Sequence, residues 1–160
     1  EFAAELLRAC KAQGWDTAIE TTGAGITEAV EKVITYVDTV LLDIKHLDTE
    51  KHKKFTGIGN EQILKNAARI SQISSTVVRV PVIPGFNYSE EEIRAITEFA
   101  KTLRGMRTIH LLPYHTFGEN KYDLLGRDYA LADIKPLKPE ELEHLKTMVE
   151  REGFQCIIGG

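Results

Sequence analysis

The chain alternates amphipathic helical segments with short apolar strands, and this alternation limits the possible folds more than any other feature. Apolar residues recur at helical spacing in one segment after another, and a short apolar or β-branched run follows each segment. Strands are expected at residues 16–20, 37–44, 76–83, 108–112 and 154–158. This order is typical of an α/β protein with a parallel sheet, either a doubly wound sheet or an arc of a (β/α) barrel.

The length and composition are those of one compact domain. The 160 residues are 42% hydrophobic and 28% charged, which is enough apolar material for one core, so we expect a single unit over residues 1–160. The net charge is -4, with 20 Lys and Arg residues against 24 Asp and Glu residues. There is thus no excess of positive charge to attract nucleic acid or an anionic membrane, and neither partner is expected.

The cysteine content predicts a protein of a reducing compartment. Cys10 and Cys156 lie near opposite ends of the chain without CxxC spacing, so neither a disulfide framework nor a self-contained metal cluster is predicted. No apolar run reaches the roughly 18 residues that a membrane span needs, and we expect a soluble, cytoplasmic protein. Glu1 is not Met and leads directly into a helical pattern, which indicates a piece of a longer chain.

Arg79 is the most informative of the polar residues in and after the predicted strands. The valines around it share one face of their strand: Val78, Val80 and Val82. Arg79 must therefore point to the opposite face. A cation shielded from water needs an anion, which can be a carboxylate of the protein or a carboxylate or phosphate of a ligand. Both alternatives are open from the sequence.

Other polar residues lie where the predicted strands end, which is where parallel sheets bind ligands. Asp43 and Lys45 are two residues apart and project to the same side, either toward a ligand or as an ion pair at the rim. Glu20 and Thr21 offer oxygen atoms for a cation or a ribose, and the alternative is that Thr21 or Thr22 caps the next helix. His115 can bind a ligand or transfer a proton, and it can equally be an ordinary loop residue.

Four motifs end the first four predicted strands in this order: Glu20–Gly23, Leu42–Asp48, Arg79–Gly85 and Leu111–His115. Together they resemble the motifs of the radical S-adenosylmethionine (SAM) enzymes that activate glycyl radical enzymes, the pyruvate formate-lyase activating enzyme family. The resemblance continues through two further segments, Gly118–Tyr122 and Gly126–Tyr129. The stretch from Asp43 to Gly57 is most similar to the activating enzymes of glycyl radical decarboxylases and diol dehydratases.

The resemblance implies a partial (β/α)6 barrel of the radical SAM type, of which this chain is the C-terminal part. It also implies that Lys45, Arg79 and His115 contact SAM on its carboxylate and ribose side, because they match family positions with this role. A monovalent cation lies near the cofactor in the type enzyme, at the positions that match Glu20, Thr21, Leu41 and Asp43. Glu20 stands where the family has an aspartate.

The resemblance further implies the activity of the complete protein. A reduced 4Fe-4S cluster cleaves SAM to methionine and a 5′-deoxyadenosyl radical, which abstracts hydrogen from a backbone glycine of a partner glycyl radical enzyme, and flavodoxin or ferredoxin donates the electron. The CxxxCxxC motif that binds the cluster and the Gly-Gly-Glu motif that holds the methionine amino group are absent from these residues. We therefore expect these residues alone to bind no cluster and to be inactive.

Two other interpretations remain open from the sequence. An aldolase-like barrel would use Lys45 as a Schiff-base nucleophile at a strand end and Arg79 to bind a substrate phosphate. A docking half-barrel without catalytic function would only bind the partner protein.

Overall fold

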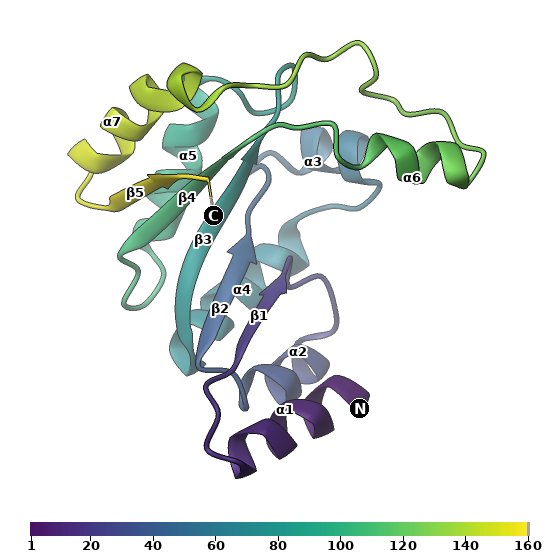
Figure 1. The fold of residues 1–160 in the computed structure, drawn as a ribbon. Coiled ribbons are helices and arrows are strands. Elements are labelled where there is room, and N and C mark those ends of the chain that lie inside the picture. Colours follow the sequence, from purple (N-terminus) through teal and green to yellow (C-terminus); the bar gives the residue numbers. More distant parts are fainter. Residues whose placement is uncertain (160) are drawn as a thin grey trace.

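The structure is a computed structural model that describes residues 1–159. Its strands form one parallel sheet in which the spatial order of the strands equals their order in the chain (Figure 1). The strands are β1 (Ala18–Thr21), β2 (Thr39–Asp43), β3 (Ser75–Val82), β4 (Thr108–Pro113) and β5 (Gln155–Ile158). All five predicted strands are confirmed, with shifts of a few residues at their ends.

The strand order distinguishes the two architectures that the periodicity left open. A doubly wound sheet reverses its strand order once, which places helices on both faces. Here each strand pairs with the next one in the chain, and connections of a single hand then place the helices that link them on one face. The doubly wound alternative is therefore wrong, and the arc of a (β/α) barrel is confirmed.

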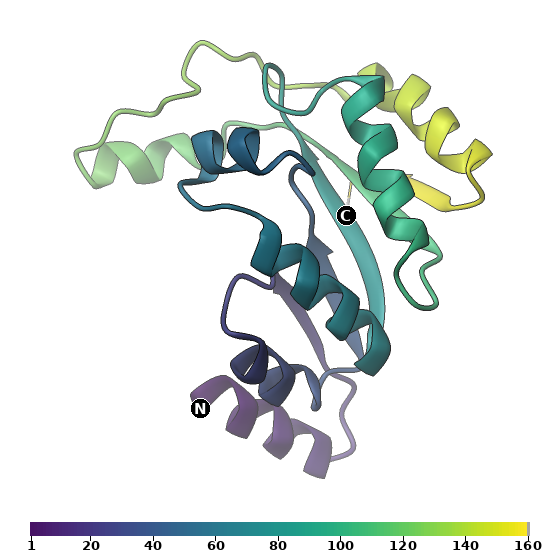
Figure 2. The same cartoon turned by 180° about the vertical axis from the view of Figure 1, so that it is seen from behind.

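The helices cover one face of the sheet and leave the other open. Figure 2 shows α4 and α5 in front of the strands, whereas in Figure 1 the strands lie in front of these helices. The helical elements are α1 (Phe2–Ala12), α2 (Thr27–Ile34), α3 (Thr49–Thr56), α4 (Glu61–Ile73), α5 (Glu90–Lys101), α6 (Glu119–Leu124), a 3-10 turn (Pro139–Leu142) and α7 (Glu143–Arg151).

Local signals explain where several helices begin and end. Ser89 caps α5, because its Oγ accepts a hydrogen bond from the Glu92 backbone N–H and donates one to the Glu92 carboxylate. Thr21 does not cap α2, which begins without a side-chain cap. Its hydroxyl instead accepts a hydrogen bond from Gly23 N–H at 3.0 Å. The capping alternative for Thr21 is therefore wrong.

Two short helices, α3 and α6, lie in segments that contain no predicted strand. The Asp48 carboxylate caps α3 by accepting a 2.7 Å hydrogen bond from Lys51 N–H, and Gly57 ends the helix at a φ of 86°. These signals are present in the sequence, but α3 carries few apolar residues and shows no strong helical periodicity. Both helices lie beyond the carboxyl ends of the strands (Figure 1).

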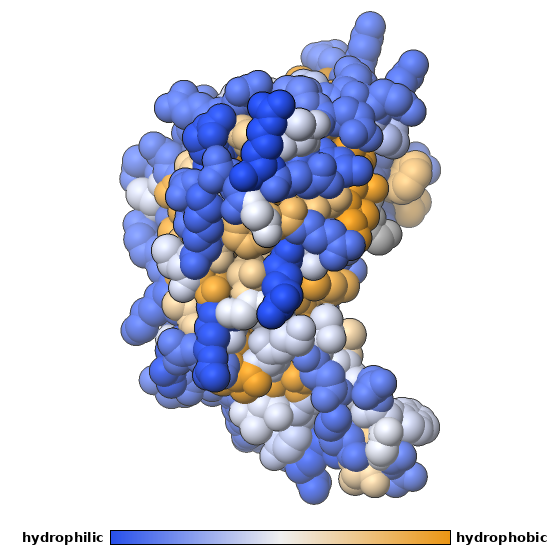
Figure 3. All heavy atoms as spheres, turned by 90° about the vertical axis from the view of Figure 1, so that its left-hand side faces the viewer, coloured by the Kyte–Doolittle hydropathy of each residue, from blue (hydrophilic) through white to orange (hydrophobic). Residues whose placement is uncertain are grey.

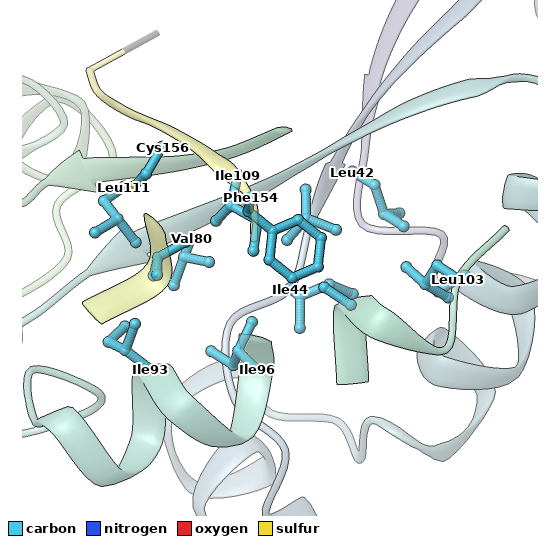
Figure 4. Packing of buried hydrophobic residues seen from close by; sticks show 14 of the residues in the cluster. Leu42, Ile44, Val80, Ile93, Ile96, Leu103, Ile109, Leu111, Phe154 and Cys156 are labelled. Atoms are coloured by element: carbon cyan, nitrogen blue, oxygen red, sulfur yellow. The ribbon is translucent and has the colours of Figure 1, made fainter. Parts of the chain in front are cut away.

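The core lies between the sheet and the helices that cover it. Val78, Val80 and Val82 are at most 1% exposed and pack on the helix side, as the alternation predicted. Figure 4 shows Ile93 and Ile96 of α5 pointing toward the strand residues. Cys156 lies in the same cluster, and burial raises the pKa of its thiol to about 12, so it stays protonated at neutral pH.

The side of the molecule that carries β5 and α7 shows hydrophobic surface between hydrophilic side chains (Figure 3). Ile157 of β5 is 39% exposed. Within residues 1–159, no helix combines the length and the apolar character that crossing a membrane requires.

Candidate functional site

The open face of the sheet brings charged and polar side chains from neighbouring strands together. The strand register pairs Asp43 of β2 with Arg79 of β3, and Arg79 with His110 of β4. Arg79 is half-buried and alternates along β3 with the fully buried valines, which confirms that it points away from the helices. It therefore lies between a carboxylate and an imidazole on a surface that no helix covers.

Arg79 has one hydrogen-bond partner on the protein and one buried nitrogen without a partner. Its Nη1 donates to the Glu20 carboxylate, whose side chain is 67% exposed. Its Nε is buried without a hydrogen-bond partner, and the nearest carboxylate oxygen, Asp43 Oδ1, is 3.9 Å away. A buried guanidinium N–H without an acceptor is unfavourable, so this geometry suits a ligand that supplies an acceptor.

Asp43 and Lys45 form the rim ion pair that was one of the two predicted alternatives. Lys45 Nζ lies 2.8 Å from Asp43 Oδ2, and each side chain is about a quarter exposed. Asp43 thus lies between two cationic side chains, Lys45 and Arg79. The pair is accessible enough to rearrange around a ligand, because partly exposed ion pairs contribute little to folding.

Two adjoining cavities lie at the carboxyl ends of β2, β3 and β4. One, of about 270 Å³, is lined by Asp43, Arg79 and His115, together with Pro81, Ile83, Leu112, Pro113 and Tyr114. The other, of about 390 Å³, is lined by Lys45 and mainly apolar side chains, among them Phe55, Phe86, Tyr122 and Tyr129. Ile83 lines both cavities, and the Lys45–Asp43 ion pair also connects them. The structure thus brings Arg79 and His115 into one cavity and places Lys45 in the next.

The residues predicted for a monovalent cation lie near one another on β1 and β2. Glu20 pairs with Leu41 in the strand register, and Asp43 follows two residues later. The two carboxylates contact Arg79 and Lys45, and the Thr21 hydroxyl contacts Gly23 N–H. Across residues 1–159, no cluster of three or more His, Cys, Asp and Glu side chains is arranged to hold a metal ion. Cation binding stays a prediction.

Sequence reasoning missed two polar residues of this region. His110 is not among the predicted site residues, yet its Nδ1 is buried without a hydrogen-bond partner. Burial and the neighbouring Arg79 guanidinium lower the pKa of His110 below its usual range. The alternation of Thr108–Leu112 could have placed His110 on the same face as Arg79. Asn87 follows β3, is fully buried and bonds to the residues around both cavities.

The described residues fit one of the two predicted cofactors. SAM carries a carboxylate, an ammonium group and ribose hydroxyls, and the free Arg79 donor and the Asp43 carboxylate in one cavity complement these groups. The 4Fe-4S cluster does not fit, because its thiolate ligands are missing. Cys10 belongs to α1 and Cys156 is buried in β5, and no other cysteine occurs in the sequence.

Comparison with known families identifies the class of protein. Residues 1–100 match the family described as the "Radical SAM superfamily", and this match covers more than half of the chain. The chain belongs to the radical SAM superfamily.

Among individual proteins, the chain is similar to activating enzymes. The chain is 36% identical to the trans-4-hydroxy-L-proline dehydratase activating enzyme of Clostridioides difficile, over 100% of this chain and 54% of that protein. It is 38% identical to the 4-hydroxyphenylacetate decarboxylase activating enzyme of Clostridioides difficile strain CD196, over 99% of this chain and 51% of that protein. The chain thus spans about half the length of the curated relatives it matches.

A solved structure of similar size shares the fold. A domain of pyruvate-formate lyase-activating enzyme from Bacteroides vulgatus matches with a TM-score of 0.80 and 28% sequence identity, over 99% of this chain and 90% of that chain. The likeness covers all strands and helices described above.

Proposed function

We propose that this chain is the SAM-binding part of an activating enzyme that generates a glycyl radical on a partner enzyme. The observation that carries the proposal is the free, buried Arg79 Nε at a cavity that Asp43 and His115 also line. The similarity to two activating enzymes extends over at least 99% of the chain and supports the same function. Together with a 4Fe-4S cluster bound elsewhere in the complete protein, SAM supplies the radical chemistry.

The residues of this chain bind and orient the cofactor. Arg79 donates a hydrogen bond from Nε to the SAM carboxylate, and the buried N–H thereby gains the acceptor that it lacks in the protein. Lys45 and His115 contact the carboxylate and ribose side, Lys45 from the edge of the adjoining cavity and His115 from the exposed rim. Asp43 holds Lys45 in place through their 2.8 Å ion pair. A monovalent cation bound by Glu20, Thr21, Leu41 and Asp43 is part of the same proposal.

The substrate in this proposal is a glycine-containing segment of a protein, and the electron donor is flavodoxin or ferredoxin. The cavity of about 390 Å³ next to Lys45 has room for a large side chain of such a segment. Its aromatic lining favours an apolar group over a polar one. A protein with these partners works in a reducing compartment, and we propose the cytoplasm.

The test uses the complete gene product, reconstituted with iron and sulfide without oxygen and supplied with SAM and a reductant. We expect release of 5′-deoxyadenosine and a glycyl radical signal by electron paramagnetic resonance on a partner, with trans-4-hydroxy-L-proline dehydratase and 4-hydroxyphenylacetate decarboxylase as first candidates. Arg79→Ala should weaken SAM binding roughly tenfold or more, because it removes a charge-assisted hydrogen bond.

Arg69→Ala is the matched control. Arg69 is an arginine of α4 that pairs with Glu31 on the helix side, remote from both cavities, so SAM affinity should not change. Equal SAM affinity of the Arg79→Ala variant and the wild type would contradict the site. Trapping of a carbonyl substrate on Lys45 by borohydride, without SAM cleavage, would instead support the aldolase-like alternative.

A further inference from the structure

Asn87 connects the loop after β2 to the end of β3 through its side-chain amide. Its Nδ2 donates to the carbonyl oxygens of Lys45 and Pro81, each at 2.8 Å, and its Oδ1 accepts from Ile83 N–H at 2.7 Å. The residue is 0% exposed, so water does not compete for these bonds. One side chain thus holds three backbone groups, two of which belong to residues that line the smaller cavity.

The bonds of Asn87 lie where a proline ends the backbone ladder between β2 and β3. Ile44 N–H donates to the Arg79 carbonyl oxygen at 2.9 Å, just past the last paired residues of β2 and β3. In a parallel ladder the next bond would be donated by residue 81, but Pro81 has no N–H. The ladder therefore stops next to Lys45, and the Asn87 amide fixes the Lys45 carbonyl at this point.

The turn after β3 brings Asn87 back to the strand end. Phe86 N–H and Asn87 N–H both donate to the Ile83 carbonyl oxygen at 3.1 Å, and Gly85 takes a φ of 77°, which few other residues adopt. The Phe86 ring stacks on His46, next to Lys45 in the chain, with ring centroids 5.2 Å apart. Turn and stacking thus fix Asn87 against the loop that carries Lys45.

We propose that Asn87 is a positioning residue for SAM: it places Lys45 and the Pro81–Ile83 wall where the cofactor binds. This inference rests on the proposed function. Its mechanism is indirect, because the Asn87 amide is fully buried and uses its bonds on the backbone. Loss of the amide frees the Lys45 backbone, and the Lys45 Nζ that contacts Asp43 is then no longer held in one place.

A second buried asparagine provides a matched control. Asn66 is also 0% exposed, and its Nδ2 also donates to two backbone carbonyls, those of Gly23 at 2.7 Å and Gly25 at 2.9 Å. These glycines line neither of the two cavities. Asn66→Ala therefore removes two buried amide-to-carbonyl hydrogen bonds, as Asn87→Ala does, but it leaves the loop of Lys45 intact.

The experiment measures SAM dissociation constants of the reconstituted complete protein by equilibrium dialysis. We expect Asn87→Ala to raise the dissociation constant roughly tenfold, and Asn66→Ala to change it by less than about twofold at a similar loss of thermal stability. Asn87→Ser retains one hydrogen-bonding group and should give an intermediate increase. It takes the place of the alanine variant if that variant does not fold.

A double-mutant cycle with Lys45→Ala tests whether Asn87 acts through Lys45. If it does, Asn87→Ala raises the SAM dissociation constant by a smaller factor in the Lys45→Ala background than in the wild type, because one of the groups that Asn87 positions is already absent. Unchanged affinity in the single Asn87 variants, or fully additive losses in the cycle, would overturn the inference while the proposed function stands. A wild-type protein that neither binds nor cleaves SAM would overturn the proposed function itself.

Discussion

The helix-covered face of the sheet and its open face are built from the same strands but carry different side chains. On the covered face, Val78 and Leu42 are 0% exposed and belong to the hydrophobic core cluster. On the open face, Arg79 and His110 each keep a buried nitrogen without a hydrogen-bond partner. The side chains of the covered face therefore find their packing partners within the fold, whereas the open face keeps polar atoms without a partner.

This difference shows how a strand separates folding from binding. Successive residues point to opposite faces, so one eight-residue strand, β3, supplies core valines and the cavity-lining Arg79 in turn. A register slip of one residue would exchange the two sets, burying the guanidinium and exposing the valines. Burial of the apolar face thus fixes the strand register, and the strand register fixes where the charged side chains of the other face lie.

The largest expected effect is a difference in stability between alanine variants of two adjacent leucines of β2. Leu42→Ala, on the covered face, should lower the free energy of unfolding by about 2–5 kcal/mol, because it leaves a cavity in the core. Leu41→Ala, on the open face, removes the same atoms from a half-buried position and should lower it by less than about half as much. Urea denaturation of both variants measures the difference. Equal losses of stability would mean that side chains on the open face are packed as tightly as those of the core.

A second prediction concerns side-chain hydrogen bonds made by α4, one of the helices that cover the sheet. Asn66→Ala should lower the free energy of unfolding by about 1–3 kcal/mol, because the carbonyls of Gly23 and Gly25 lose their buried donor. Gln62→Ala removes an exposed amide that bonds to Asn66 and Thr27, and it should lower stability by less than about 0.5 kcal/mol. Chemical denaturation checks both values. A larger loss for Gln62→Ala would contradict the importance of burial here.

A third prediction addresses the charge on the open face. Arg79→Met should change the free energy of unfolding by no more than about 1 kcal/mol, because the lost ion pair involves a mostly exposed Glu20 and the lost Nε has no partner. Thermal and urea denaturation of the ligand-free protein measure this change. A loss comparable to that of Leu42→Ala would show that Arg79 holds the sheet together, and the contrast between the faces would fail.

The smallest expected effect is a pH dependence due to His110. Its pKa is lowered in the folded protein by burial and by Arg79, so the unfolded chain binds a proton more readily. Stability should be complete above the ordinary histidine pKa of about 6.5 and fall as the pH decreases from there toward the lowered value. His110→Gln should reduce this slope, measured as the difference between urea midpoints at neutral and mildly acidic pH. An identical slope in the variant would exclude His110 as the cause.

Periodicity was sufficient to predict the strands, the helices that cover them and the direction of Arg79, because each depends on neighbours in the chain. It could not decide between a doubly wound sheet and a barrel arc, since strand order is a property of contacts distant in sequence. Asp43 and Lys45 were placed on one side correctly from their spacing.

The parts of the site that the sequence did not reveal depend on distant partners. The pairing of Arg79 with Glu20 links residues of two strands that are not neighbours in the sheet. The role of Asn87 depends on a turn that returns it to the end of β2, and no local pattern indicates this contact. His110 could have been found by applying to β4 the alternation that was applied to β3.

The strand order has a consequence for how the chain folds. Since every strand pairs with its successor, the sheet can assemble one βα unit at a time without contacts between remote parts of the chain. The longest connection between paired strands precedes β5 and contains α6, so closing it carries the highest loop entropy. We expect β5 to gain protection from hydrogen exchange last during refolding, and the strands from β1 to β4 to order as a preformed template for it.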